Sequence, residues 1–219
     1  MRTGTFVLSC CLLIVASGAA AEPATALRVV TRFDSAELAP DSPDRLPRTI
    51  WRSGPNMVRI EGIVSAETGH KMLLVANSPH LWLADLESAT GSHTVDPGPE
   101  IGAEVPVFPL PIDALSELQI GNESDYFREH RAQPKGRTSM DGRACERQDI
   151  ETPEYLLVGC FEPFTGRPVA IGVRVGTAVM AVTYLEYDRN AQLPEGAFSR
   201  PPGVEFMDRP HQGETHAAQ

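Results

Sequence analysis

A short hairpin around Gly54-Pro55-Asn56 constrains this chain more than any other feature. Glycine tolerates positive φ, proline fixes φ, and asparagine hydrogen-bonds its own backbone, so the three residues predict a tight turn. If Arg52 pairs with Met57, one face of the hairpin is apolar and carries Thr49, Trp51, Val58 and Ile60. The other face is mostly charged and carries Ile50, Arg52, Met57, Arg59 and Glu61. The hairpin therefore predicts a sheet with one face turned to a core or to a ligand.

The N-terminus has the pattern of a secretion signal. Arg2 precedes an apolar run from Phe6 to Val15, which ends in the small residues Ala19-Ala20-Ala21. The run is too short for a typical membrane span and is followed by an A-x-A cleavage site. Residues 1–21 are therefore predicted to be a signal peptide, the alternative being an uncleaved membrane anchor. Both cysteines of this segment lie inside the apolar run, which favours a soluble exported protein over a lipoprotein.

The remainder predicts one domain. Cleavage after residue 21 of the 219 leaves 198 residues, enough for a sizeable core, and changes the net charge from −10 to −11. An acidic chain argues against nucleic acid as a partner. No second long apolar run occurs, so no transmembrane segment is expected in the mature chain. We expect the domain to cover residues 22–207 and a disordered polar tail to cover 208–219.

Two cysteines remain after cleavage, Cys145 and Cys160. An oxidising compartment favours their pairing. A hairpin through 151–154 would place Ile150 opposite Tyr155 and hence Cys145 opposite Cys160. Opposed strand positions have Cβ atoms about 4.5–5.5 Å apart, close to the disulfide range. The spacing predicts a structural disulfide.

Runs of β-forming residues dominate the rest of the chain. The expected strands, besides the hairpin, cover residues 26–33, 72–76, 81–86, 92–95, 143–150, 155–161, 168–175 and 177–187. The pair 72–76 and 81–86 is apolar on both faces, so we expect it to be covered on both. Short connections make the sheet largely antiparallel.

Helical signals are confined to the middle. Pro111 suits a first helical position, and Ile112, Leu115 and Leu118 fall on one face before a stop at Gly121. A second short helix is expected over 123–131, followed by polar, turn-rich sequence over 133–142. The prediction is a mainly β, α+β fold in which a curved sheet carries short helices on one side.

Three stretches resemble the LolA/LolB lipoprotein-carrier superfamily, in the family's order. They are Trp51 with Pro55-Asn56, the strand–turn–strand from Leu73 to Leu83, and Phe198-Ser199-Arg200-Pro201-Pro202-Gly203-Val204. The resemblance implies an unclosed, strongly curved antiparallel β-barrel with a helical lid over an apolar cavity. It also implies a periplasmic protein that shields the acyl chains of lipoproteins. The family's arginine before Pro-Asn is replaced here by Gly54.

The sequence contains no recognisable catalytic or metal-binding motif. The six histidines show no zinc spacing, and no G-x-S-x-G nucleophile motif occurs. We therefore expect no enzyme activity, no metal and no cofactor. The residues expected to line the cavity or form its lid are Trp51, Val58, Ile60, Trp82, Ile112, Leu115 and Leu118, although each is also a plausible core residue.

Two functions remain open at this stage. One is an exported periplasmic binding or carrier protein for lipid or lipoprotein acyl chains, or for another apolar ligand. The alternative is a periplasmic sensor or scaffold module that binds another envelope protein.

Overall fold

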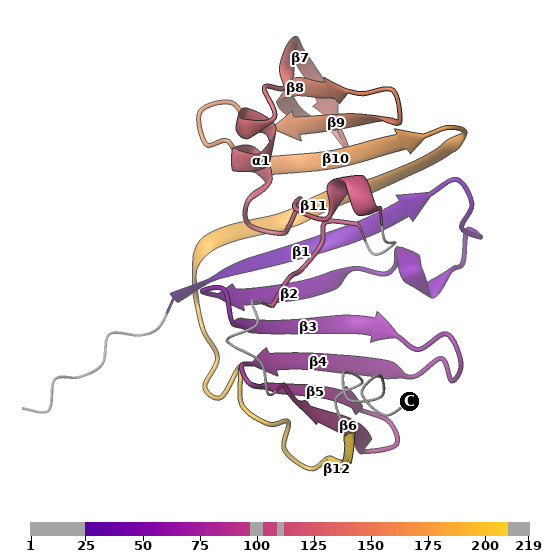
Figure 1. Ribbon diagram of the computed structural model, residues 1–219, viewed down its shortest axis with the longest axis vertical. Helices are drawn as coiled ribbons and strands as arrows, with labels where there is room; N and C mark the ends of the chain where they lie inside the picture. Colours follow the sequence, from indigo (N-terminus) through magenta and orange to yellow (C-terminus); the bar gives the residue numbers. More distant parts are fainter. Residues whose placement is uncertain (1–24, 97–102, 109–111, 210–219) are drawn as a thin grey trace, which may run out of the picture.

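One twelve-stranded sheet forms the body of the protein in a computed structural model, which describes residues 25–96, 103–108 and 112–209 (Figure 1). The strands are β1 (Thr25–Ser35), β2 (Arg48–Ser53), β3 (Met57–Val64), β4 (Lys71–Asn77), β5 (His80–Asp85), β6 (Thr90–Val95), β7 (Gln133–Met140), β8 (Arg143–Glu151), β9 (Tyr155–Phe161), β10 (Pro168–Val175), β11 (Ala178–Gln192) and β12 (Glu205–Arg209). Their order in the sheet is β12-β6-β5-β4-β3-β2-β1-β11-β10-β9-β8-β7.

The sheet is curved and unclosed, because β12 and β7 lie at opposite edges (Figure 1). Neighbouring strands are antiparallel except β12, which runs parallel to β6. These features confirm the predicted mainly β, unclosed antiparallel fold. The expected strands are all present, since β-branched and aromatic residues suit a pleated, half-buried surface.

Helical structure is shorter than predicted. It consists of the 3₁₀ turns η1 (Pro43–Arg45) and η2 (Asp113–Leu115) and the helix α1 (Glu123–Glu129), which lies over β9 and β10 (Figure 1). The predicted helix after Pro111 is wrong beyond η2. There the backbone pairs with 105–107 instead: Val107 N–H donates to the Leu118 carbonyl, and Ile120 N–H donates to the Val105 carbonyl. Those bonds take the groups that a helix would have paired internally.

Residues 133–142 also differ from the prediction. Gln133–Met140 form β7, whose eight residues are all exposed. Its backbone pairs with β8 on one side only. Polar side chains gave no alternating pattern there, so only the neighbouring strand decided that this segment is extended.

The β2–β3 hairpin forms with a register one residue away from the predicted one. Arg52 lies opposite Val58 instead of Met57, and Trp51 lies opposite Arg59. The reason is the turn, which spans the three residues between Ser53 and Met57 and has Gly54 at φ +63°. Because side chains alternate along a strand, a one-residue shift moves Trp51 to the face opposite Val58 and Ile60.

The predicted disulfide between Cys145 and Cys160 is confirmed, with Cα atoms 5.5 Å apart. The predicted register is not, because Cys160 lies opposite Arg147 and the two cysteines are diagonal neighbours. The Thr152 hydroxyl accepts hydrogen bonds from the amides of Glu154 and Tyr155, which sets a turn of residues 152–155. The turn lies one residue later than predicted, which shifts the pairing of the two strands by two positions.

Two apolar clusters lie on opposite faces of the sheet. We call the face covered by residues 103–108 and 112–130 the inner face; its cluster includes Val29, Ile50, Val58, Leu118 and Phe127. On the other, outer face, a smaller cluster contains Leu73, Val75, Trp82 and Ala84, with Val204 and Phe206 packed against it. The β4–β5 pair is therefore covered on its outer face, whereas on its inner face Ala76 packs against the inner cluster and Leu81 stays exposed, so the expected cover on both faces is met only in part.

The chain ends differ in part from the expectation. Asp208 and Arg209 belong to β12, whereas the sequence placed them in a disordered tail. They are ordered by parallel pairing with His93 and Thr94 of β6. The predicted signal peptide, residues 1–21, and the rest of the predicted tail, residues 210–219, lie outside the described residues.

Candidate ligand-binding site

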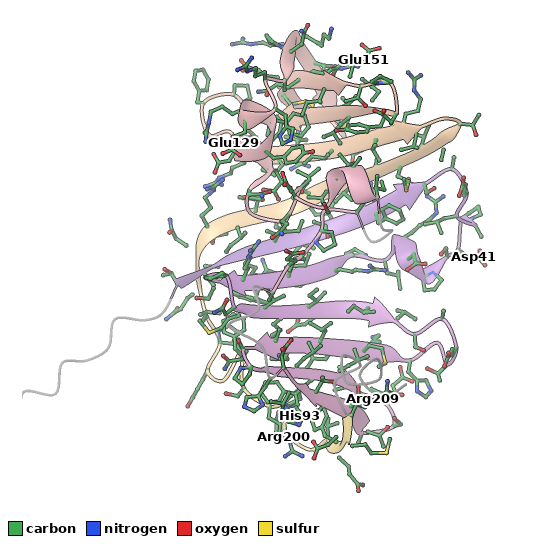
Figure 2. The ribbon with its side chains drawn as sticks, viewed as in Figure 1. Asp41, His93, Glu129, Glu151, Arg200 and Arg209 are labelled. Carbon is green, nitrogen blue, oxygen red and sulfur yellow. A yellow bond between two sulfur atoms is a disulfide. The ribbon has the colours of Figure 1, made fainter. Side chains whose placement is uncertain are left out.

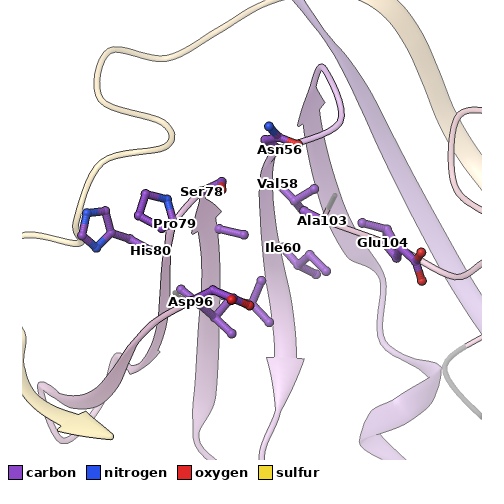
Figure 3. Close-up of a pocket in the computed structure, with 13 residues that line it drawn as sticks. Asn56, Val58, Ile60, Ser78, Pro79, His80, Asp96, Ala103 and Glu104 are labelled. Carbon is purple, nitrogen blue, oxygen red and sulfur yellow. The ribbon is translucent and has the colours of Figure 1, made fainter. Parts of the chain in front are cut away.

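An apolar pocket of about 330 Å³ lies on the inner face of β3, β4 and β5 (Figure 3). Its lining residues are Asn56, Val58, Ile60, Leu74, Ala76, Ser78, Pro79, His80, Leu81, Asp96, Ala103, Glu104 and Val105. The volume falls at the lower end of the range of small-molecule sites, which are mostly apolar with a few polar groups. We call it the main pocket.

Strand register brings these apolar side chains together. Val58 lies opposite Ala76 on β4, and Ala76 lies opposite Leu81 on β5. Ile60 likewise lies opposite Leu74. Residues that face each other across antiparallel strands project from the same side of the sheet. A continuous apolar surface over three strands is the result.

The loops at one end of the main pocket are tied to each other. Ser78 N–H donates to the Asn56 carbonyl at 3.2 Å, and Asp96 N–H donates to the Pro79 carbonyl at 2.9 Å. Ala103 N–H donates to the Pro55 carbonyl at 2.7 Å. These bonds hold residue 103 and the two hairpin turns in place around the pocket.

A second, smaller pocket of about 230 Å³ adjoins the first. The two share Ile60 and Val105 as lining residues. Its walls are Thr31, Phe33, Arg48, Ile50, Ile60, Ile63, Val105, Pro106, Val107 and Val182. We call it the Arg48 pocket, because Arg48 is the one charged residue among the described residues that line it.

Residues 103–108 and 112–122 form a cover over the inner face. Leu115, Leu118 and Ile120 of this cover are buried in the inner cluster, and Ile112 is partly buried against it. From the sheet below, the Arg52 guanidinium donates to the Ile120 carbonyl at 2.7 Å and to the Gln119 side-chain oxygen at 3.3 Å. One charged side chain thereby fastens the cover to β2.

Some of the predicted cavity and lid residues lie at this site. Val58 lines the main pocket, and Ile60 lines both pockets. Ile112, Leu115 and Leu118 lie in the cover and pack into the inner cluster. The structure therefore brings five of the seven predicted residues to the inner face.

Trp51 and Trp82 are placed elsewhere, and the predicted common face of Trp51 with Val58 and Ile60 is wrong. Trp51 is on the outer face, where the Arg28 guanidinium lies 5.5 Å from its ring centroid. Trp82 is buried in the outer cluster and stacks with His80 and His93 at centroid distances of 5.2 and 5.4 Å. The one-residue error in the predicted β2–β3 register explains why Trp51 was assigned to the wrong face. Both faces of β4 and β5 are apolar, so the sequence pattern did not show to which face Trp82 points.

The C-terminal segment covers Trp82 on the outer face. His93 Nδ1 lies 2.8 Å from an Asp208 carboxylate oxygen, and the Arg200 guanidinium lies 5.1 Å from the Phe206 ring centroid. Figure 2 shows His93, Arg200 and Arg209 gathered at this end of the sheet. A Cβ on Gly91 would come within 2.7 Å of the Phe206 ring, so only glycine leaves room for that ring. Trp82 is thus a core residue of the outer face.

Sequence reasoning missed the residues that line the site from β2, β4 and β5. Leu74, Ala76 and Leu81 were hidden because both faces of their strands are apolar. Arg52 was placed on the mostly charged face of the hairpin and Arg48 was assigned to no face, yet both flank buried Ile50 on the inner face. The alternation R-x-I-x-R was visible, but its face depended on the register.

A fully buried carboxylate lies beside the cover. Glu123, in the first turn of α1, accepts hydrogen bonds from the hydroxyls of Tyr184 at 3.0 Å and Tyr187 at 3.1 Å. Burial raises the pKa of Glu123 above its ordinary value, and the tyrosine hydrogen bonds oppose this shift only in part. This group fastens α1 to β11 and is sensitive to pH.

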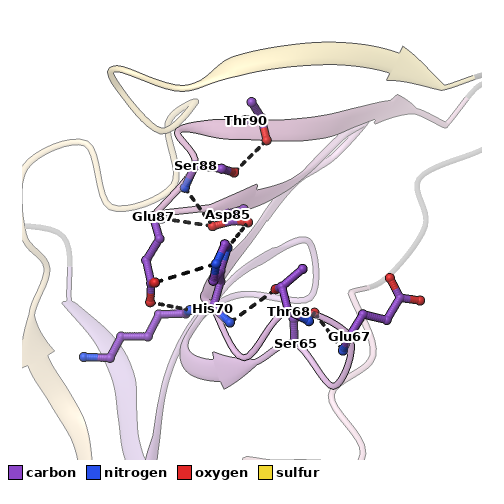
Figure 4. A network of polar contacts seen from close by, with 9 residues as sticks. Ser65, Glu67, Thr68, His70, Asp85, Glu87, Ser88 and Thr90 are labelled. Atoms are coloured by element: carbon purple, nitrogen blue, oxygen red, sulfur yellow. Dashed lines mark hydrogen bonds and ion pairs between the residues drawn. The ribbon is translucent and has the colours of Figure 1, made fainter.

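A second polar network lies where β4 begins and β5 ends (Figure 4). His70 Nδ1 and an Asp85 oxygen are 2.8 Å apart, and this bond raises the pKa of His70 and lowers that of Asp85. Asp85 also accepts the amides of Glu87 and Ser88. The network joins two turns, and none of its residues lines the main pocket or the Arg48 pocket.

Comparison with known proteins gives structural matches but no sequence match. No protein-family model matches the chain, and no curated protein sequence does. Among solved structures, a conserved uncharacterized protein from Thermus thermophilus is 9% identical, with a TM-score of 0.49 over 84% of this chain and 91% of that one. The Mycobacterium tuberculosis lipoprotein LppX is 10% identical, with a TM-score of 0.44 over 78% of this chain and 90% of that one.

A third match carries a name from the family that the sequence resembles. It is a Vibrio parahaemolyticus domain provisionally described as an outer membrane lipoprotein-sorting protein. It is 10% identical, with a TM-score of 0.30 over 80% of this chain and 88% of that one. These scores are too low to transfer function, so the proposals below rest on the residues of this chain.

Two searches of the described residues complete the description of the site. No helix within them has the length and hydrophobicity that a membrane crossing requires. Within the same residues, His, Cys, Asp and Glu form no group of three or more suited to a metal ion.

Proposed function

We propose that this protein is an exported, periplasmic binding or carrier protein that shelters lipid or lipoprotein acyl chains, or another apolar ligand. The observation that supports it is the apolar pocket on the inner face, bounded by Val58, Leu74, Ala76 and Leu81 and adjoined by the cover. Transfer of apolar chain from water contributes about 0.8 kcal/mol per CH₂. Such binding needs shape and an apolar surface, and no bond of the ligand has to be broken.

Movement of the cover would let a ligand enter the pockets. The cover's polar attachment to β2 runs through Arg52, while two backbone hydrogen bonds between 105–107 and 118–120 join the two halves of the cover to each other. A ligand that fills the space between Ile60 and Val105 would compete with the packing of the cover on the sheet. We expect the cover to move by a small amount when the pockets are occupied.

Direct isolation of the ligand tests the function. Protein purified from the periplasm is analysed by native mass spectrometry and by lipid extraction, and co-purified acyl species are expected. A fluorescent apolar probe should bind the delipidated protein at one site. Wild-type protein that carries no acyl species and has no affinity for the probe would refute apolar-ligand binding.

A variant that fills the pocket locates the binding site. Ala76→Phe should lower probe affinity by about tenfold or more, because a benzyl group would occupy the volume between Val58 and Leu81. Ala144→Phe is the matched control, since Ala144 is exposed on β8 and lies outside both pockets. Equal affinity of the two variants would move the site elsewhere.

One observation favours the alternative role as a module that binds an envelope protein. The edge strand β7 has eight exposed residues and pairs on one side only. Free strand edges accept an additional strand from a partner chain. An empty wild-type protein whose β7 amides become protected from hydrogen exchange on adding an envelope protein would support this second function.

A further inference from the structure

We propose that the ligand is a single-chain amphiphile whose anionic head group, a carboxylate or a phosphate, binds Arg48 while its apolar chain passes Ile60 into the main pocket. This inference rests on the proposed function and names its ligand class. It starts from the composition of the Arg48 pocket. Apart from Arg48, the described side chains that line that pocket are apolar except for Thr31.

Arg48 is an incompletely satisfied cation. Its Nη2 donates to Asp44 at 2.7 Å, and its side chain is 19% exposed. Its Nε is buried without a hydrogen-bond partner, the one such side-chain nitrogen or oxygen among the described residues. Buried donors are nearly always paired, so this N–H marks a place where an acceptor is favoured.

The chemistry of the acceptor follows from the guanidinium. Arginine keeps its charge at every physiological pH and offers N–H groups in a planar fork that matches carboxylate or phosphate oxygens. An ester or an alcohol would accept a weaker, uncharged hydrogen bond. An ionised head group at Arg48 is therefore preferred over a neutral one.

The position of the apolar chain follows from the neighbouring pocket. Ile60 and Val105 belong to both pockets, so a chain that starts at Arg48 meets the apolar surface of Val58, Leu74 and Leu81. The rim of the main pocket carries the carboxylates Asp96 and Glu104 (Figure 3). These acidic groups disfavour an anion there, which leaves the Arg48 pocket for the head group.

Three sixteen-carbon probes of equal chain length test this assignment. Palmitate and hexadecyl phosphate carry anionic heads, and hexadecanol is their neutral match. Each displaces a fluorescent apolar dye from the mature protein below its micelle-forming concentration. We expect at least one anionic probe to bind about tenfold or more tightly than hexadecanol, because charge-assisted hydrogen bonds exceed neutral ones by that order. The tighter anion identifies the head group as carboxylate or phosphate.

Variants attribute the preference to Arg48. Arg48→Gln should bind all three probes with about the affinity of hexadecanol. Arg32→Gln is the control, because Arg32 is an exposed arginine of β1 that pairs with Asp141 outside both pockets. Asp44→Asn should increase the preference for the anion, since it removes the carboxylate that Arg48 contacts. That variant also tests the inference if Arg48→Gln does not fold.

The outcomes separate this inference from the function beneath it. Equal affinity of wild-type protein for hexadecanol and both anions would overturn the anionic head group and leave apolar binding intact. A preference that survives in Arg48→Gln, or that Asp44→Asn leaves unchanged, would overturn the role of Arg48. Failure of wild-type protein to bind any of the three would overturn both proposals.

Discussion

The guanidinium of Arg52 donates to the backbone carbonyl of Ile120 at 2.7 Å across 68 residues of sequence. This contact connects the middle of the β2–β3 hairpin to the cover over the inner face. The resemblance to lipoprotein carriers placed an arginine at position 54, where this chain has glycine. We infer that Arg52, two residues earlier and on the inner face, is the cation that holds the cover here.

Removal of this contact should loosen the cover. Arg52→Met is expected to lower the free energy of unfolding by about 1.5–3 kcal/mol, the range for hydrogen bonds to charged groups. Hydrogen exchange at the Ile120 amide, which donates to Val105, should become faster. Arg32→Met serves as an exposed control in the same measurement. Unchanged exchange at Ile120 would show that the cover is held by packing alone.

Phe127 of α1 packs against bare backbone at Gly159 of β9. A Cβ at Gly159 would lie 2.7 Å from the Phe127 ring and 2.4 Å from the Phe161 ring. Both rings are buried, so Gly159→Ala should cost about 1–3 kcal/mol by overpacking. Gly172→Ala, one strand away, is the control, because its Cβ would be 3.5 Å from the nearest atom. Urea denaturation of the two variants should separate them; equal stability would contradict the tight packing of α1.

Glu123 makes stability depend on pH. Its pKa is raised in the folded state, so folding takes up a proton and the contribution is fully present below the ordinary value of 4.5. That contribution declines as pH rises through the raised folded-state pKa. Glu123→Gln should remove this decline and be more stable than wild type at pH 7. Melting temperatures from pH 4 to 8 measure it, with Glu129→Gln, an exposed glutamate of the same helix, as control (Figure 2). Parallel profiles for wild type and Glu123→Gln would reject the assignment.

The disulfide should stabilise mainly by restricting the unfolded chain. Cys145 and Cys160 are 15 residues apart, a loop that the chain-entropy model values at about 3 kcal/mol. The double variant with serine at both positions is expected to lose about that amount of unfolding free energy. Chemical denaturation with and without reductant checks it, since reductant should affect wild type and leave the variant unchanged.

Local sequence was sufficient to predict most strands and the disulfide. Alternating β-branched and aromatic residues specify extended structure wherever they occur, as in Val169, Ile171 and Val173. The helix prediction after Pro111 was wrong because its leucines also suit the extended part of the cover, whose backbone pairs with residues 105–107. β7 was missed because none of its side chains is buried, so its sequence shows no alternation of apolar and polar residues.

Only some residues of the candidate site could be predicted from the sequence. Val58 and Ile60 were predicted to line it, and they do line the pockets. Trp51 was assigned to the same face because the turn was counted one residue too long. Leu74 and Leu81 could not be chosen over Leu73 and Trp82, since both sets alternate along apolar strands.

Sequence alone determined that this chain forms an antiparallel, disulfide-linked sheet with an apolar surface left to cover. Propensity, turn chemistry and cysteine spacing act over a few residues, so they can be read without a fold. Tertiary structure decided which face is inner, because a shift of one residue in a hairpin exchanges the faces of a whole strand. It also placed Arg48 and Arg52 under the cover, where their charges meet an apolar surface instead of solvent.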